Sequence, residues 1–101
     1  MNDYSAALQR KREDLLSAGV LMLDPSAVYV EEGVCVGAGT MLLPGTILRG
    51  ETVIGQNCVI GPQTMLTSCT VGDGCTVNAS QCEESTIETD CQIGPYTHIR
   101  P

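Results

Sequence analysis

Six cysteines and one histidine are the side chains in this sequence that could bind a metal, form disulfides or take part in catalysis. Cys58, Cys75 and Cys91 are 17 and 16 residues apart, unlike the closely spaced Cys-x-x-Cys pairs of zinc sites. Six cysteines in so short a chain would indicate a disulfide framework if the protein were secreted. His98 is the only histidine, which excludes a zinc site made of three histidines. The chemistry open to these groups depends on where the fold places them.

The composition argues against several classes of function. The net charge is −7, and three of the five basic residues lie together at 10–12, whereas nucleic-acid binding needs a positive surface. The sequence has no apolar run long enough to span a membrane and no N-terminal leader pattern. It also has no motif for a serine or cysteine nucleophile, a P-loop or a dinucleotide-binding loop. We expect a soluble, cytoplasmic chain that binds neither nucleic acid nor membrane.

From Val28 onward, one pattern recurs every five or six residues: a small residue, any residue, then an aliphatic one. Residues two apart in a strand face the same way, so each pair places two side chains on one inward face. Glycine often follows the aliphatic residue, where the backbone must turn without a side chain in the way. The pairs are Val28/Val30, Val34/Val36, Thr40/Leu42, Thr46/Leu48, Thr52/Ile54, Cys58/Ile60, Thr64/Leu66, Cys69/Val71, Cys75/Val77, Ser80/Cys82, Ser85/Ile87, Cys91/Ile93 and Thr97/Ile99.

Short strands separated by tight turns at this period predict an all-β fold, a parallel β-helix built from hexapeptide repeats. With three strands to a coil, the spacing gives about four complete coils, and the absence of Trp and Phe agrees with a narrow core. The aliphatic residues should then stack in three columns: Val30, Leu48, Leu66, Cys82 and Ile99; Val36, Ile54, Val71 and Ile87; Leu42, Ile60, Val77 and Ile93.

The same alternation assigns the cysteines. Four of them occupy small inward slots and Cys82 an aliphatic one, so only Cys35 points outward. Stacked side chains point in the same direction rather than toward each other. We therefore favour reduced core thiols, with disulfides and a metal site as the alternatives.

The residues before the repeats predict one amphipathic helix. Asn2 and Asp3 are suitable caps for a helix over residues 4–17, with Leu8 and Leu15 on one face and Gly19 as its stop. The turn at Asp24-Pro25 ends this unit. We divide the chain into a linker helix with an extended segment at 1–23 and a β-helix at 24–101.

Together these features resemble a known family. The run NDYSAALQRKREDLLSAGVLMLDPSAVYV, followed by GTILRGETVIG, CVIGPQTMLTSCTVGDGCTV and IGPYTHIRP, is similar to the bacterial bifunctional N-acetylglucosamine-1-phosphate uridyltransferase/glucosamine-1-phosphate acetyltransferase family. The resemblance covers essentially all of the sequence. It implies a left-handed β-helix, a handedness that the spacing alone does not determine.

The resemblance also implies function. The family makes UDP-N-acetylglucosamine, a peptidoglycan precursor: a trimeric β-helix acetylates glucosamine-1-phosphate with acetyl-CoA, and an N-terminal Mg²⁺-dependent domain then transfers uridylyl. Asn2 matches an asparagine that helps to hold Mg²⁺, and Arg100 an arginine that contacts the phosphorylated sugar. Both His98 and Arg100 flank the inward residue Ile99, so they should point outward. His98 does not match the family's catalytic histidine, which belongs to later coils, and we expect it to be an exposed or interface residue.

On this reading the sequence contains neither the nucleotidyltransferase domain nor the catalytic histidine. We expect it to be the non-catalytic or incomplete start of the acetyltransferase β-helix, truncated at its C-terminus, with no cofactor of its own and with self-association into a homotrimer. The alternatives are a stand-alone short β-helix that acts as a scaffold and, less favoured because the threonines point inward, a ligand-binding or ice-binding solenoid.

Overall fold

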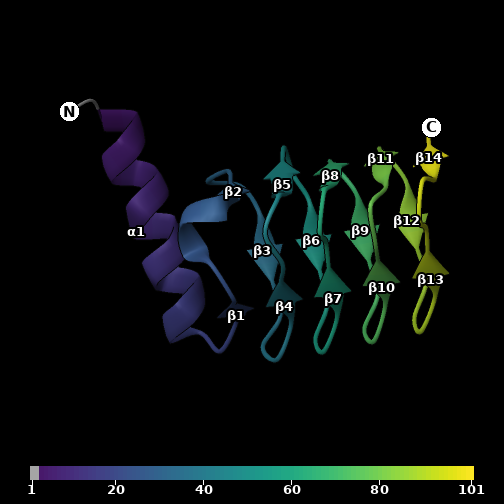
Figure 1. Cartoon of the computed structure of the whole chain (residues 1–101), viewed down its shortest axis with the longest axis horizontal. Coiled ribbons are helices and arrows are strands. Elements are labelled where there is room, and N and C mark those ends of the chain that lie inside the picture. Colours follow the sequence, from purple (N-terminus) through teal and green to yellow (C-terminus); the bar gives the residue numbers. More distant parts are fainter. Residues whose placement is uncertain (1–2) are drawn as a thin grey trace.

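The computed structural model describes residues 3–101, and the side chains of residues 5–101. It contains one helix and 14 short strands, with the helix at one end and the strands stacked in coils along the long axis (Figure 1). The elements are α1 (Asp3–Ser17), β1 (Leu21–Met22), a 3-10 turn (Pro25–Ala27), β2 (Val28–Val30), β3 (Cys35–Val36), β4 (Met41–Leu42), β5 (Thr46–Arg49), β6 (Val53–Ile54), β7 (Val59–Ile60), β8 (Thr64–Thr67), β9 (Thr70–Val71), β10 (Thr76–Val77), β11 (Gln81–Glu83), β12 (Thr86–Ile87), β13 (Gln92–Ile93) and β14 (His98–Ile99).

The strands form three parallel sheets, one on each side of the coil. The strand orders are β1-β4-β7-β10-β13, β2-β5-β8-β11-β14 and β3-β6-β9-β12. In Figure 1 the sheet that begins with β2 lies along the upper edge, and the sheet that begins with β1 lies along the lower edge. Each strand from β1 to β11 pairs with the strand three places further along the chain. This is the topology of a parallel β-helix, as the periodicity predicts.

The strand register confirms the three columns of aliphatic residues. Val30 lies opposite Leu48, Leu48 opposite Leu66, and Leu66 opposite Cys82. The other two sheets align their predicted members in the same way. A step of five residues instead of six therefore leaves the register of the inward residues intact.

The first sheet begins earlier than the repeats do in the sequence. β1 lies in the extended segment that the sequence analysis placed in the linker, yet Leu21 pairs with Met41 and Met22 with Leu42. This strand adds one side to the stack and brings the solenoid to about five turns, compared with about four complete coils predicted. The repeat pattern misses it because the pair two residues apart here, Val20 and Met22, precedes the next pair by eight residues instead of five or six.

The core is a thin column of small and aliphatic side chains. Leu42, Leu48, Ile60, Leu66 and Val77 have no exposed surface. The buried threonines satisfy their hydroxyl groups within the backbone: Thr40 Oγ1 donates to the Gly55 carbonyl oxygen at 2.7 Å and accepts from the Cys58 amide at 3.1 Å. Among the described residues, every buried side-chain nitrogen and oxygen has a hydrogen-bond partner.

Two kinds of constraint explain the turn glycines. At Gly61 φ is +105°, a conformation that favours glycine. At Gly37 the limit is the neighbouring coil, because a Cβ there would lie 2.6 Å from the Gly55 carbonyl carbon. Close stacking of coils, as well as chain reversal, thus selects glycine after the aliphatic residue.

Helix α1 covers the open edge of the first coil. Leu15 is buried against the core, and Arg12 donates from Nε and Nη2 to the Val28 carbonyl oxygen at 3.1 and 2.9 Å. Lys11 Nζ donates to the carbonyl oxygens of Glu32 and Val34 at 3.1 and 2.7 Å. These bonds satisfy carbonyl groups that have no earlier coil to pair with. No helix in the described part of the chain is long and apolar enough to cross a membrane.

Candidate functional site

The outer face of the β2-β5-β8-β11-β14 sheet carries the groups best placed to meet a ligand. Strand alternation turns one residue of each strand outward, and the register stacks these residues in the order Tyr29, Ile47, Met65, Gln81 and His98. The column is apolar in the first three coils and polar in the last two. The polar residues of this column thus lie at the end near β14.

A shallow groove of about 390 Å³ follows this column. One wall is the outward column from Ile47 to His98, and the other is a row of turn residues: Gly45, Gln63, Ala79 and Tyr96. Tyr96 is 89% exposed. The groove offers two amide side chains, a phenol and an imidazole, which suit a hydroxylated ligand more than an apolar one.

His98 lines this groove and pairs with Glu83, which lies beside it. Its Nε2 lies 3.3 Å from Glu83 Oε1, and both side chains remain partly exposed. This contact with the carboxylate orients the imidazole ring. The sequence analysis treated His98 as an exposed or interface residue, and the structure confirms that it is exposed.

Arg100 follows β14 directly and is exposed. No hydrogen bond or ion pair engages its guanidinium group within residues 3–101, so the group is available to an anion. It lies two residues beyond His98, past the end of the groove. The other predicted site residue, Asn2, lies outside the described residues.

The inward cysteines do not contribute to this surface. Cys58, Cys69, Cys75 and Cys82 are buried, Cys91 is half-buried, and Cys35 is exposed as predicted; all six thiols are free. Cys58 Sγ donates to the Gly72 carbonyl oxygen at 3.1 Å and Cys75 Sγ to that of Glu88 at 2.8 Å. Cys58 and Cys75 thus take, one and two coils later, the place of the Thr40 hydroxyl, which donates to the Gly55 carbonyl oxygen.

Burial makes these thiols poor nucleophiles. Desolvation raises the pKa of Cys82 to about 11, with a further contribution from the nearby Cys69, and desolvation also raises the pKa of Cys75. A thiolate is the reactive form of cysteine. The buried cysteines are therefore core residues rather than catalytic ones.

Sequence reasoning missed three groups of the groove and one group beside it. Glu83 was not paired with His98, and Gln63, Gln81 and Tyr96 were not noticed. The signal for Glu83 was available, because the predicted column aligns Cys82 with Ile99 and so brings the neighbours of both residues together. Gln63 and Tyr96 lie in turns at positive φ, where only the three-dimensional path of the chain shows their direction.

The described residues do not form a metal centre. No three histidine, cysteine, aspartate or glutamate side chains within residues 3–101 converge in an arrangement that could hold a metal ion. The acidic residues are spread over different coils, and Asp73, for example, accepts a hydrogen bond from the Gln56 amide at 2.8 Å. This carboxylate bridges two coils at a turn.

The repeats match a known family model. The bacterial transferase hexapeptide (six repeats) model matches residues 36–68 and 51–80. This is the sequence pattern of left-handed β-helices, and together with the topology it confirms the predicted fold class.

Individual relatives give the same result over more of the chain. It is 44% identical over 94 residues to the bifunctional protein GlmU of Bdellovibrio bacteriovorus, 38% over 91 residues to that of Thermotoga maritima and 36% over 93 residues to that of Enterococcus faecalis. These matches cover 90–92% of the chain but only 20% of each relative. The chain thus spans about a fifth of the length of the relatives it matches.

Proposed function

Because this chain is a hexapeptide-repeat β-helix similar over nine-tenths of its length to part of the bifunctional GlmU proteins, we propose that it forms the first coils of an acetyltransferase that serves UDP-N-acetylglucosamine synthesis. The similarity to these relatives is the observation that carries the proposal. Residues 1–23 would link the β-helix to a nucleotidyltransferase domain, and residues 24–101 would begin the acetyltransferase domain. The protein would act in the cytoplasm.

The reaction proposed for the complete enzyme is acetyl transfer from acetyl-CoA to the amine of glucosamine-1-phosphate. The amine nitrogen attacks the thioester carbonyl, the carbon–nitrogen bond forms, and the carbon–sulfur bond breaks as CoA leaves. A base must take the proton of the amine, and donors must stabilise the oxyanion. We assign these roles to groups outside this chain.

The contribution of this chain is to bind and orient the acceptor. Arg100 is exposed and unpaired within the described residues, so its guanidinium group can donate two parallel hydrogen bonds to a phosphate. The groove beside it offers Gln81 and His98 for sugar hydroxyl groups. Arg100, Gln81 and His98 bind the acceptor in this proposal and take no part in making or breaking covalent bonds.

The second activity of the complete enzyme, uridylyl transfer, uses Mg²⁺. The described residues do not fit such a site, since no suitable cluster of ligands occurs among them. Asn2 is proposed as one ligand in the complete protein, where the remaining ligands would come from the nucleotidyltransferase domain. No step of the reaction is assigned to a metal through this chain.

Assembly as a homotrimer belongs to the same proposal. In the first three coils the outward residues Ile47, Val53 and Met65 are apolar and partly or largely exposed, which suits a contact between β-helices lying side by side. A neighbouring protomer would then complete the acceptor site around Arg100.

The role of Arg100 can be tested in the complete native protein. Arg100→Ala should raise the KM for glucosamine-1-phosphate by about tenfold or more, the loss expected for a charge-assisted phosphate contact, with a smaller change in the KM for acetyl-CoA. Arg100→Lys should recover part of the loss. Transfer would be followed by the decrease in thioester absorbance.

The control is Arg49→Ala, because Arg49 is an exposed arginine whose one ion pair, to Glu31 at 3.9 Å, is long. Equal KM values for Arg100→Ala and wild type would show that Arg100 does not contact the acceptor. If the complete protein had no acetyl transfer activity at all, the proposed function itself would fail, and a non-catalytic scaffold would replace it.

A further inference from the structure

Glu83 and Arg100 are neighbours on the outer face of the sheet, yet they do not pair. The register places Cys82 opposite Ile99, so the residues that follow them, Glu83 and Arg100, stand side by side in successive coils. Neighbouring strands lie about 4.8 Å apart, a distance that these two long side chains can bridge. The Glu83 carboxylate instead contacts His98 Nε2 at 3.3 Å, and no hydrogen bond or ion pair engages the Arg100 guanidinium group in the described part of the chain.

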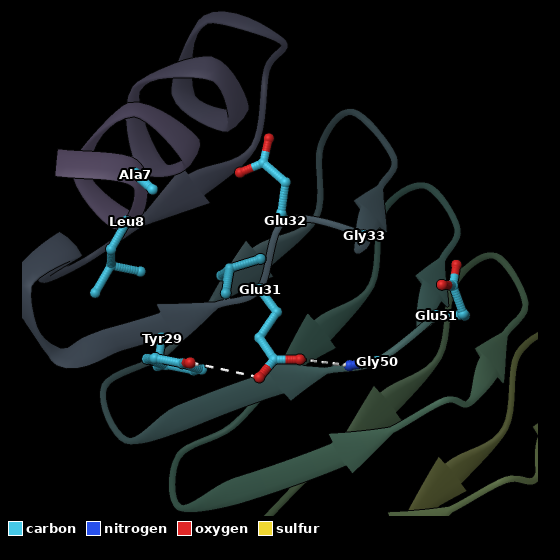
Figure 2. Close-up of a pocket in the computed structure, with 9 residues that line it drawn as sticks. Ala7, Leu8, Tyr29, Glu31, Glu32, Gly33, Gly50 and Glu51 are labelled. Carbon is cyan, nitrogen blue, oxygen red and sulfur yellow. Dashed lines mark hydrogen bonds between the residues drawn. The ribbon is translucent and has the colours of Figure 1, made fainter. Parts of the chain in front are cut away.

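The first coils contain an equivalent pair of an acidic residue and an arginine. Val30 lies opposite Leu48, so Glu31 and Arg49, which follow them, stand in the same relation as the later pair. Here the two side chains do meet, because Arg49 Nε lies 3.9 Å from Glu31 Oε2. The Glu31 carboxylate also accepts from the Gly50 amide at 2.9 Å (Figure 2). In this column, a glutamate in one coil can therefore reach the arginine of the next coil.

The outward residue two positions before each arginine distinguishes the two pairs. Residues two apart in a strand share a face. Ile47 stands two residues before Arg49, and its side chain cannot bind a carboxylate. His98 stands two residues before Arg100 and presents Nε2 to the Glu83 carboxylate. A carboxylate only accepts hydrogen bonds, so Nε2 carries the hydrogen in this contact.

We propose that His98 is a positioning residue: by holding the Glu83 carboxylate, it keeps the Arg100 guanidinium group free for the phosphate of the acceptor. This role rests on the proposed function, in which Arg100 binds that phosphate. A carboxylate and a phosphate use the same guanidinium donors, so a released Glu83 would compete with the acceptor. His98 has a second ring nitrogen, Nδ1, and can therefore hold Glu83 and still offer a group to the acceptor.

The competition within the protein can be measured on the whole chain without substrate. His98→Ile gives the later pair the same neighbour as the first pair, so the Glu83 carboxylate should turn to Arg100. The nuclear magnetic resonance signal of the Arg100 Nε–H group, assigned by its loss in Arg100→Lys, should shift and exchange more slowly with water. Adding Glu83→Gln should reverse both changes, and the Arg49 signal is the internal reference. An Arg100 signal that is the same in His98→Ile and wild type would overturn the proposal.

The effect on the acceptor can be measured in the complete native protein. His98→Ile should raise the KM for glucosamine-1-phosphate, and adding Glu83→Gln should lower this KM again by about threefold, as expected for the loss of an exposed ion pair. Adding Glu84→Gln instead removes the same charge from the adjacent exposed residue and should leave the raised KM in place. His98→Gln keeps a donor for Glu83, so it should raise the KM less than His98→Ile does. No recovery with Glu83→Gln, or an equal recovery with Glu84→Gln, would contradict the positioning role.

A wrong positioning role and a wrong proposed function would give different results. If His98 only contacts the acceptor, His98→Ile raises the KM, but Glu83→Gln does not lower it and the Arg100 signal stays as in wild type. An unchanged KM in Arg100→Ala would instead contradict the proposed acceptor site, and the positioning role would fail with it.

Discussion

The inner and outer faces of the same strands follow different rules. Inside, all coils repeat one arrangement of a small residue and an aliphatic residue, and burial is nearly complete from Val28 to Cys82. Outside, the residues change from Leu21, Met41, Val59, Tyr29, Ile47 and Met65 in the first three coils to Thr76, Gln92, Gln81 and His98 in the last two. The inner face is determined by the fold, and the outer face is free to serve binding.

Adjacent residues on one strand provide the strongest test of this difference. Ile60 has no exposed surface, whereas Val59 next to it points outward. Ile60→Asp should prevent folding, because it leaves an unpaired charge in the core at a cost of about 4 kcal/mol or more. Val59→Asp should fold and cost about 1 kcal/mol or less.

Circular dichroism and thermal melting of the two variants measure this prediction. A soluble Ile60→Asp protein with the spectrum and melting temperature of wild type would refute the assignment of the inner face. Loss of structure in both variants would show that the outer face is constrained as strongly as the inner one.

The inner face also differs between early and late coils. Leu48 and Leu66 occupy the column position that Cys82 takes in the next coil. A buried thiol can be ionised only at high pH, since desolvation raises the pKa of Cys82 from 9.0 to about 11. Below pH 9 the thiol is protonated in both states. Between pH 9 and 11 only the unfolded state releases the proton, so stability falls as pH rises.

Cys82→Val removes this titration while keeping an apolar side chain in the slot. Urea unfolding at about pH 8 and about pH 10.5 should show that wild type loses more free energy of unfolding than Cys82→Val does. Other groups titrate equally in both proteins, so the difference between them reports on the Cys82 thiol alone. This difference should be smaller than the effect of Ile60→Asp. An identical pH dependence would mean that the Cys82 thiol is not desolvated in the folded state.

The sequence was enough to predict the inner face, since the two residues of each inward pair lie two positions apart and the pairs recur every five or six residues. It predicted the columns through Leu66 and Ile60 and the outward position of Cys35. It did not predict β1, because the Leu21-Met22 strand joins the sheet by backbone pairing with β4 and lies outside the five- or six-residue spacing of the repeat. Almost any residue type allows backbone pairing, so a strand of two residues cannot be recognised from its sequence.

The outer face was predictable only in part. Alternation showed that His98 and Arg100 point outward, but the pairing of His98 with Glu83 depends on how neighbouring coils align. The hollow between α1 and the first coil (Figure 2) was not predicted, because its volume depends on the angle between the helix and the coil. The sequence showed that Lys11 and Arg12 lie together with Arg10, but not that they bind backbone carbonyl groups of the first coil.

The central functional claim is that this chain is the start of an acetyltransferase β-helix within a larger polypeptide. The direct measurement is the mass of the native product that carries this segment, detected in cells with an antibody raised against it. Since the matched region covers 20% of the Bdellovibrio relative, the account predicts a polypeptide about five times longer than the present 101 residues. A product of 10.7 kDa would contradict it and would indicate an independent short β-helix with partners still to be found.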